Sequence, residues 1–317
     1  MENFIFKIIL NTKKRLIFKI LGINFSIRKI RLSKRKIKLL NLEYEQGRAK
    51  TPIVLNVEKT MQELISTNKS IVRYGDGEFN LIFGDGIFYQ DFDVNLQKNL
   101  KEILLSNDEN LMIGIPDAFG DLSKHNKNYI WFWQKYMAYN RQEMYKILDL
   151  SKTYYDAFVS RFYMQYLGKT NSEKLFKDFQ KIWENKDVVL IEGEFSRLGY
   201  NNDLLDNTKS LKRILCPSKN AYSSIDKIEE VCNEFSKDTL FIIALGPAAT
   251  VLAYRLHKKG YRALDLGHID VEYEWFKQKA LTKIPIKDKY VNDAKNGRCE
   301  SELKDTIYQS QIYQKIL

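Results

Sequence analysis

The stretch Leu240-Phe-Ile-Ile-Ala-Leu-Gly-Pro-Ala-Ala-Thr250 decides the fold. Its first half is an uncharged apolar run of strand length, and Pro247 stands where a helix would begin, with Gly260 where that helix would end. The amide groups at such a helix start favour phosphate oxygens, although tight packing of the strand against the helix explains the same small residues. The stretch has neither the lysine of a P-loop ATPase nor the glycine spacing of a nicotinamide enzyme.

Outward from this stretch, short apolar runs alternate with helical patterns from residue 51 onward. The predicted strands are 71–74, 111–116, 157–162, 188–192, 211–217, 240–245 and 263–266. The predicted helices are 57–65, 93–105, 129–148, 172–183, 224–235 and 247–259, and Thr170 with Glu173 predicts a capping box before one of them. This alternation predicts an α/β fold, a mostly parallel sheet with helices on both faces. A last helix is expected near 301–316.

The 317 residues carry a net charge of +11, and 44% of them are hydrophobic, as is typical of a folded protein. Residues 1–38 contain twelve basic residues and one acidic residue, so they account for the whole net charge. The remaining 279 residues hold 39 basic and 39 acidic residues and are neutral. This distribution disfavours a nucleic-acid enzyme, because the positive field of such an enzyme should cover the folded domain itself.

The basic N-terminal segment has an amphipathic pattern. Residues 4–21 place polar residues at helical spacings of three to five, and Gly22 is a plausible stop. We expect residues 1–50 to form an N-terminal extension. Within it, residues 1–38 are expected to bind an anionic membrane surface through this helix, and the cluster Lys34-Arg35-Lys36 adds a second cationic patch. The alternative is a helix packed on the main domain with solvated lysines.

Three further features bear on the cellular compartment. No apolar run reaches the ~20 residues that a membrane-spanning helix needs, and the N-terminus lacks the cleavage site of a secretion signal. The cysteines Cys216, Cys232 and Cys299 are odd in number and form no CxxC pair, which favours a reducing compartment over disulfides or a zinc site. The sequence thus predicts a cytoplasmic protein, peripheral on the inner face of the cell membrane.

Polar and glycine-rich residues follow the predicted strands. The carboxyl ends of parallel strands meet at one edge of the sheet, so we expect these residues to form one ligand site. In Arg73-Tyr-Gly-Asp-Gly-Glu78, an extended segment would point the carboxylates of Asp76 and Glu78 the same way, toward one Mg²⁺ or Mn²⁺. Gly75 and Gly77 would let phosphates approach the backbone. A surface turn is the alternative, because Asp-Gly is a common turn dipeptide.

Two later segments add polar groups to the predicted site. After the run at 188–192, Arg197 could clamp a phosphate, and Glu194 or Asp203 could accept hydrogen bonds from sugar hydroxyls. A solvated loop is the alternative there. After the run at 263–266, His268 or the nearby Asp270 could serve as a base, and a purely structural histidine is the alternative.

Five motifs, in consistent order, resemble the GT-D glycosyltransferases, a Rossmann-like family found in bacterial surface-glycan and glycoprotein gene clusters. The motifs are Arg73-Tyr-Gly-Asp-Gly-Glu78, Glu192-Gly-Glu-Phe-Ser-Arg-Leu-Gly199, Asn202-Asp203, Leu245-Gly-Pro-Ala-Ala-Thr250 and Leu266-Gly-His-Ile-Asp-Val-Glu-Tyr-Glu-Trp275. The resemblance covers roughly residues 55 to 280. We therefore expect a glycosyltransferase domain over 51–285 and a C-terminal tail over 286–317.

The resemblance implies a metal-dependent glycosyltransferase that moves a sugar from a nucleotide-sugar, typically a UDP-sugar, to a glycan, lipid-linked or protein-linked acceptor. Its D-x-E motif falls on Asp76 and Glu78, which would hold Mn²⁺ or Mg²⁺. The predicted donor-binding residues are Arg73, Gly75, Gly77, Glu194, Arg197, Asn202, Asp203, Gly246, Pro247 and Thr250. His268 or Asp270 is the candidate base for the acceptor hydroxyl, and a retaining reaction would need none. The alternative function is a non-catalytic nucleotide-sugar-binding protein at the membrane surface.

Overall fold

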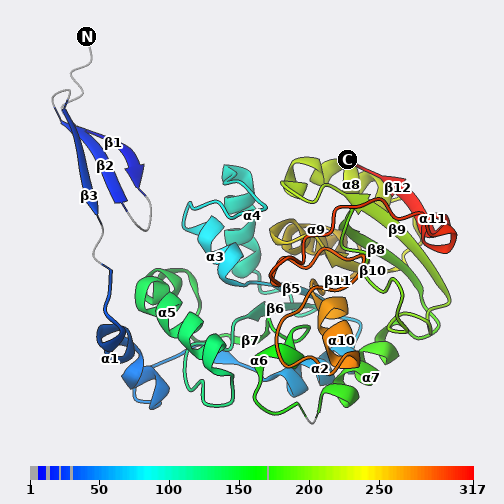
Figure 1. Ribbon diagram of the computed structural model, residues 1–317, viewed down its shortest axis with the longest axis horizontal. Helices are drawn as coiled ribbons and strands as arrows, with labels where there is room; N and C mark the ends of the chain where they lie inside the picture. Colours follow the sequence, from blue (N-terminus) through cyan, green and yellow to red (C-terminus); the bar gives the residue numbers. More distant parts are fainter. Residues whose placement is uncertain (1–5, 12–14, 21–22, 29–30, 170) are drawn as a thin grey trace.

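The computed structural model describes the chain except residues 1–5, 12–14, 21–22, 29–30 and 170. Its centre is a nine-stranded sheet in the order β12-β9-β8-β10-β11-β5-β6-β7-β4, and all of its pairings are parallel (Figure 1). The strands are β4 (Ile53–Val54), β5 (Ser70–Arg73), β6 (Leu111–Ile115), β7 (Thr153–Asp156), β8 (Asp187–Gly193), β9 (Ser210–Cys216), β10 (Leu240–Ala244), β11 (Arg262–Asp265) and β12 (Ile312–Lys315). The predicted α/β fold is confirmed.

Helices cover both faces of this sheet (Figure 1). They are α2 (Val57–Ser66), α3 (Asp76–Ile82), α4 (Val94–Leu104), α5 (Lys127–Ile147), α6 (Phe162–Gln165), α7 (Ser172–Trp183), α8 (Ile225–Cys232), α9 (Pro247–Lys258) and α10 (Ile269–Lys277). Successive side chains of a strand point to opposite faces, so each strand contributes to two cores. Val72 and Val189 pack in the core that includes residues of α4, α5, α8 and α9, whereas Ile71 and Val188 pack in the core with residues of α2, α7 and α10. Strands buried on both faces are continuous apolar runs, which made them visible in the sequence.

Most predicted elements of the sheet and its helices are confirmed to within a few residues, including the start of α9 at Pro247. The predicted strand at 157–162 is wrong, because β7 ends at Asp156 and the chain then turns into the short helix α6. The cause is local: Asp156 Oδ1 accepts a hydrogen bond from Phe158 N at 2.8 Å, which turns the backbone. Of the predicted capping box, Thr170 lies outside the described residues, and Asn171 is the N-cap of α7.

The N-terminal segment differs from its prediction. The helix expected at 4–21 is wrong, because the described residues form an antiparallel three-stranded sheet of β1 (Phe6–Asn11), β2 (Arg15–Ile20) and β3 (Ile23–Arg28). β-branched and aromatic residues dominate these strands, and β3 alternates apolar and polar residues with the period of two that a strand requires. In Figure 1 this small sheet stands apart from the main body, beyond helix α1 (Lys34–Glu45).

Helix α1 is fastened to the main body. Ile37 and Asn41 are its buried residues, and Asn41 Nδ2 donates a hydrogen bond to Gln134 O of α5 at 2.9 Å. Arg141, also on α5, donates from Nη2 to Asn41 Oδ1 at 2.8 Å. Within the described parts of the chain, no helix is both long enough and apolar enough to cross a membrane.

The C-terminal residues form a shorter helix than predicted, followed by a strand. Instead of one helix near 301–316, the chain has α11 (Thr306–Gln311) and then β12, which pairs with β9 at the edge of the main sheet. Asp305 starts the helix, because its Oδ1 accepts from Tyr308 N at 2.7 Å. The next residues extend because β9 offers an unpaired edge, and pairing satisfies backbone groups that would otherwise lie open.

Candidate active site

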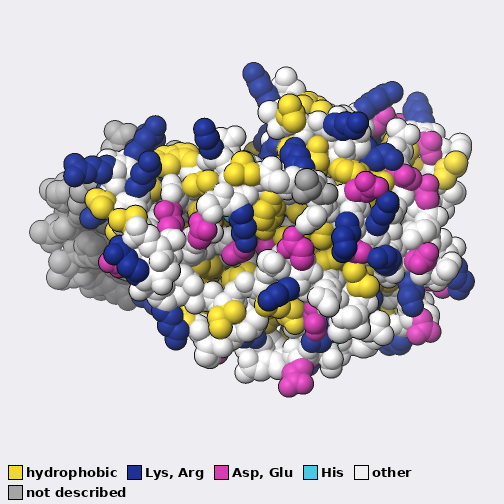
Figure 2. Space-filling model, turned by 90° about the horizontal axis from the view of Figure 1, so that it is seen from below, with side chains coloured by type: hydrophobic (Ala, Val, Ile, Leu, Met, Phe, Trp, Pro, Cys, Tyr) yellow, Lys and Arg dark blue, Asp and Glu magenta, His cyan; other side chains and the backbone are white. Residues whose placement is uncertain are grey.

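A cavity of about 1300 Å³ lies at the carboxyl ends of the parallel strands. The residues that line it follow β5 (Asp76), β7 (Arg161), β9 (Ser218), β10 (Gly246) and β11 (His268). Crossover helices bring strands that are far apart in the sequence side by side, so all these residues meet at one edge of the sheet. On the face of the molecule drawn in Figure 2, basic and acidic side chains are interspersed with apolar ones.

The cavity brings together eight of the residues predicted from the sequence. They are Arg73, Gly75, Asp76, Gly77, Glu78, Gly246, His268 and Asp270. The other six predicted residues, Glu194, Arg197, Asn202, Asp203, Pro247 and Thr250, are not among its lining. Thr250 instead lies beneath the site, where its Oγ1 donates to Arg73 O at 2.9 Å and so helps to hold the end of β5.

Asp76 and Glu78 lie in the first turn of α3, with Gly75 as the N-cap. The segment is therefore helical and not extended, and Glu78 turns back so that its Oε2 accepts a hydrogen bond from Gly75 N at 2.7 Å. Burial raises the pKa of Glu78 to about 7, and the nearby carboxylates of Asp265 and Asp76 add to that rise. Burial and two neighbouring carboxylates thus both oppose ionisation of Glu78 at this helix start.

Arg73 organises the ends of three strands. Its Nε donates to Asp265 O at 2.5 Å, its Nη2 donates to Asp265 Oδ1 at 2.8 Å, and its Nη1 donates to Ala157 O at 2.9 Å. These bonds join β5 to the last residue of β11 and to the residue just after β7. Most of its N–H groups already have partners inside the protein. Arg73 therefore holds the floor of the cavity in place with or without a bound ligand.

His268 is the N-cap of α10 and has a left-handed backbone conformation, with φ of 72°. Burial lowers the pKa of its imidazole to about 3, and the positive charge of Arg161 lowers it further. The ring is therefore neutral at physiological pH. A neutral imidazole in a cavity can accept a hydrogen bond or a proton from a ligand hydroxyl.

A cluster of charges beside His268 was missed by the sequence interpretation. Arg161 and Lys283 both form ion pairs with Asp293, the latter at 2.7 Å, and all three residues line the cavity. Although burial acts to raise the pKa of Asp293, the positive charge of Arg161, with the charge and the hydrogen bond of Lys283, holds it well below its usual range. Arg161 follows a strand and could have been suspected, but Lys283 and Asp293 lie in a polar stretch without any pattern.

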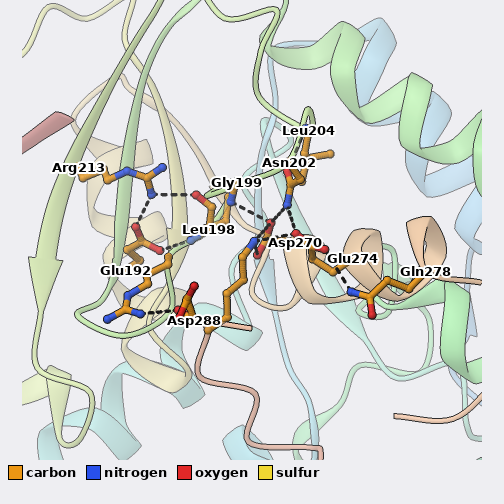
Figure 3. Close-up of polar contacts among 12 residues, drawn as sticks. Glu192, Leu198, Gly199, Asn202, Leu204, Arg213, Asp270, Glu274, Gln278 and Asp288 are labelled. Atoms are coloured by element: carbon orange, nitrogen blue, oxygen red, sulfur yellow. Dashed lines mark hydrogen bonds and ion pairs between the residues drawn. The ribbon is translucent and has the colours of Figure 1, made fainter. Parts of the chain in front are cut away.

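Asp270 is held by a buried network at the wall of the cavity (Figure 3). Its Oδ1 accepts from Gly199 N at 2.9 Å and from Asn202 Nδ2 at 2.7 Å, and Lys289 Nζ lies 2.7 Å from its Oδ2. Asn202 and Lys289 also contact Glu274. Lys289 is only 1% exposed, and Asp270 and Glu274 are its ion-pair partners. The network fastens the loop after β8 and the segment around Lys289 to α10.

A second buried ion pair lies behind that loop (Figure 3). Arg213 Nη1 donates to Glu192 Oε1 at 2.6 Å, and the other oxygen of Glu192 accepts from Leu198 N at 2.7 Å. Arg197 points away from the cavity and donates to the carbonyl oxygens of Asp288 and Ser301. Arg197 and Asn202, both predicted to bind the donor, thus hold the protein's own segments in place.

The sequence was compared with known families and proteins. A model of the family described as "Glycosyltransferase GT-D fold" matches residues 71–294. Glycosyltransferase GlyD of Streptococcus pneumoniae serotype 4 is 37% identical over 265 residues, which are 83% of this chain and 32% of that protein. The probable glycosyl transferase Gly of Streptococcus gordonii is 38% identical over 260 residues, 82% of this chain and 38% of that protein. The chain thus spans about a third of the length of the curated relatives it matches.

Solved structures share the fold over nearly their whole length. A structure described as a new glycosyltransferase (DUF1792) from Streptococcus sanguinis matches with a TM-score of 0.77 and 36% identity, covering 84% of this chain and 100% of that one. A second, described as domain of unknown function 1792 with a distinct glycosyltransferase fold, matches with a TM-score of 0.79 and 35% identity, covering 89% and 98%.

Proposed function

Because the chain belongs to the GT-D family of glycosyltransferases, we propose that its cavity transfers a sugar from a UDP-sugar to a glycan, lipid-linked or protein-linked acceptor, with Mn²⁺ or Mg²⁺ at Asp76 and Glu78. The observation that carries the proposal is the position of Asp76 and Glu78, which line the same cavity as Gly246 and His268. Two carboxylates and a glycine-bounded helix start can hold a cation and a diphosphate, and a neutral imidazole can act as the base that an inverting transfer needs.

The residues at the start of α3 fit a divalent cation that shares its ligands with a substrate. The described residues contain no cluster of three or more His, Cys, Asp or Glu that could enclose a metal. Mg²⁺ and similar cations are commonly held by one or two carboxylates, with waters and phosphate oxygens completing the shell. The raised pKa of Glu78 favours this interpretation, because a cation would relieve the repulsion among Glu78, Asp76 and Asp265. When bound, the cation would stabilise negative charge on the leaving diphosphate.

Two glycines near the carboxylates allow Tyr89 to pack close to the backbone. Gly77 and Gly246 both lie against Tyr89, and a Cβ added at Gly246 would come within 2.7 Å of the Tyr89 ring. Gly246 also has φ of 54°, which few residues other than glycine adopt. A side chain at Gly246 would therefore move Tyr89 into the cavity, where the donor is expected to lie.

His268 is the better candidate for the base. Its neutral ring lines the cavity, and the negative charge of a bound diphosphate would raise its pKa from the value of about 3 toward the working pH. Asp270 also lines the cavity, but its oxygens already accept hydrogen bonds from Gly199, Asn202 and Lys289. A proton on Asp270 would break that network, so we assign Asp270 a positioning role.

We also propose that the protein binds the inner face of the cell membrane peripherally through its basic N-terminal part. On α1, Leu39 is 55% exposed and Leu42 is largely exposed as well, and Lys34, Arg35 and Lys38 surround them on one apolar groove. A helix surface that combines exposed leucines with flanking cations suits the headgroup region of an anionic membrane.

The test of the catalytic proposal measures release of UDP from a UDP-sugar. Asp76→Asn keeps the size of the side chain and removes its charge, so turnover should fall by about 10²–10³ while donor binding changes less. Asp85→Asn is the matched control, because Asp85 also precedes a glycine but does not line the cavity. EDTA should abolish wild-type release and Mn²⁺ should restore it. A fully active Asp76→Asn variant would refute the assignment.

A further inference from the structure

The cavity extends well past the carboxylates and His268, toward α5. Sheet order separates its two sides, because β6 and β7 lie on one side of β5 and β8, β9 and β10 lie on the other. On the β8–β10 side the lining is small and rich in backbone, with Gly193, Ser196 and Ser218. On the β6–β7 side the lining is formed by α5 and the residues just after β7. The two sides thus differ in the chemistry they offer.

The side near α5 is aromatic. We define the α5 wall as the five cavity-lining residues Tyr129, Phe132, Trp133, Gln165 and Tyr166. Phe132 leaves 46% of its surface exposed, although it is apolar and borders the cavity. The ring of Trp133 packs edge-on against that of Phe132, with 5.3 Å between the ring centroids. The ring of Tyr136 stacks on that of Phe132, with 6.2 Å between the centroids. Phe132 therefore presents a supported, open ring to the cavity.

The α5 wall also contains polar groups without partners. Gln165 is only 8% exposed, yet among the described residues its Oε1 has no hydrogen-bond partner, and neither has Tyr129 Oη. A buried polar atom without a hydrogen-bond partner destabilises the fold, because it has lost its hydrogen bonds to water. The terminal torsion of a Gln side chain is broad, so Gln165 can turn one amide atom toward a ligand that brings hydroxyl groups.

Three lysines line the cavity, namely Lys127 at the start of α5, Lys169 and Lys283, and the last two have partners inside the protein. Lys169 Nζ donates to Ala280 O at 2.9 Å, and Lys283 is paired with Asp293. These two cavity-lining cations therefore already have partners. An apolar ring, an amide and a phenol match a carbohydrate, whose C–H groups pack on an aromatic face while its hydroxyls donate and accept hydrogen bonds.

We propose that the α5 wall is the acceptor subsite, and that it binds a pyranoside whose C–H face lies on Phe132 and whose hydroxyls satisfy Gln165 and Tyr129. The inference rests on the proposed glycosyltransferase function. It assigns the donor nucleotide to the β8–β10 side of the cavity and the acceptor sugar to the opposite side. The reacting groups, Asp76 and His268, would then lie between the two substrates.

The experiment uses the full chain and two kinds of probe. Binding of methyl β-D-glucopyranoside, methyl β-D-galactopyranoside and methyl N-acetyl-β-D-glucosaminide is measured by saturation-transfer NMR, and binding of UDP with Mn²⁺ is measured by thermal shift. Phe132→Ala should weaken glycoside binding about tenfold and leave UDP binding unchanged. Phe132→Tyr, which keeps the ring, should bind glycosides like the wild type. Phe92→Ala is the control, because Phe92 is 45% exposed but lies outside the cavity lining.

The outcomes separate this inference from the proposed function. If the wild type binds none of the three glycosides, or Phe132→Ala binds them as well as the wild type, the acceptor subsite is refuted. If Phe132→Ala weakens UDP binding as much as glycoside binding, the α5 wall belongs to the nucleotide and the inference is also refuted. If the wild type fails to bind UDP, the proposed donor is contradicted. Even then, a loss of glycoside binding in Phe132→Ala would support the sugar subsite.

Discussion

Replacing Glu78 with Gln should stabilise the metal-free fold at pH 8 while removing activity. Glu78 has an ordinary pKa of 4.5, which burial raises to about 7 in the folded protein. A folded-state pKa above the unfolded one means that the folded protein holds the proton more tightly. The contribution of Glu78 to stability is therefore complete below about pH 4.5 and is lost as the pH rises through 7. Gln is neutral at every pH, and its side-chain oxygen can still accept from Gly75 N.

The size of the effect follows from the two pKa values. A rise from 4.5 to about 7 corresponds to about 3 kcal/mol between the protonated and ionised forms. Water that penetrates around the ionised group would reduce this figure, so it is an upper bound. The stability gained by Glu78→Gln should thus grow from near zero at pH 4.5 to at most about 3 kcal/mol at pH 8.

Urea unfolding in EDTA, repeated from pH 4.5 to pH 8, measures this difference. Glu109→Gln, at an exposed position, is the control and should show no such trend. A stability difference that stays constant with pH, or that favours the wild type at pH 8, would refute the reasoning. Mn²⁺ with UDP should then stabilise the wild type more than Glu78→Gln, because only the wild type offers both carboxylates to the cation.

Three further predictions concern other parts of the molecule. Gly246→Ala should lower the free energy of unfolding by about 1–2 kcal/mol and should also lower the affinity for UDP. Gly84→Ala is the control, because Gly84 has positive φ but open space around it, and it should lower only the free energy of unfolding. Equal UDP affinity in the two variants would contradict the packing argument. Lys289→Met leaves buried carboxylates without their cation and should cost about 3–5 kcal/mol in urea unfolding, so a loss below 1 kcal/mol would contradict the network. The double variant Leu39→Ser/Leu42→Ser should lose co-sedimentation with anionic liposomes at low salt, and unchanged sedimentation would reject α1 as the membrane contact.

Much of the fold could be predicted because its signals are local. Strands buried on both faces are continuous apolar runs, and Pro247 with Gly260 marks one helix at both ends. Where the apolar signal was weaker, the prediction was wrong. The residues of β7 include Thr153 and Asp156, so the apolar residues just after the strand were mistaken for it. In β2, which lies within the helix predicted at 4–21, the period of two competed with charges at helical spacing, and the charges decided the interpretation wrongly.

The candidate site could be predicted only in part, for a different reason. Asp76, Glu78 and His268 follow strands directly, so the rule that strand ends converge was enough to place them in one cavity. Arg197 and Asn202 belong to equally polar loops, but they bond to the protein's own segments. Composition does not distinguish a polar group that contacts a ligand from one that contacts a distant part of the chain, because the partner depends on the tertiary packing.

The segment around Lys289 shows why such distant partners matter for function. Asp270 and Glu192 are both buried, and a buried carboxylate is stable only with partners. Glu192 finds Arg213 within the sheet, but Asp270 relies on Lys289, which lies 19 positions later in a stretch without helix or strand. Asp293, four residues beyond Lys289, binds Arg161 at the cavity in the same way. The ion pairs of Lys289 therefore join this segment to α10, and that of Asp293 joins it to the residues after β7. Because both attachments border the cavity, breaking either one should change the shape of the substrate site before it unfolds the sheet.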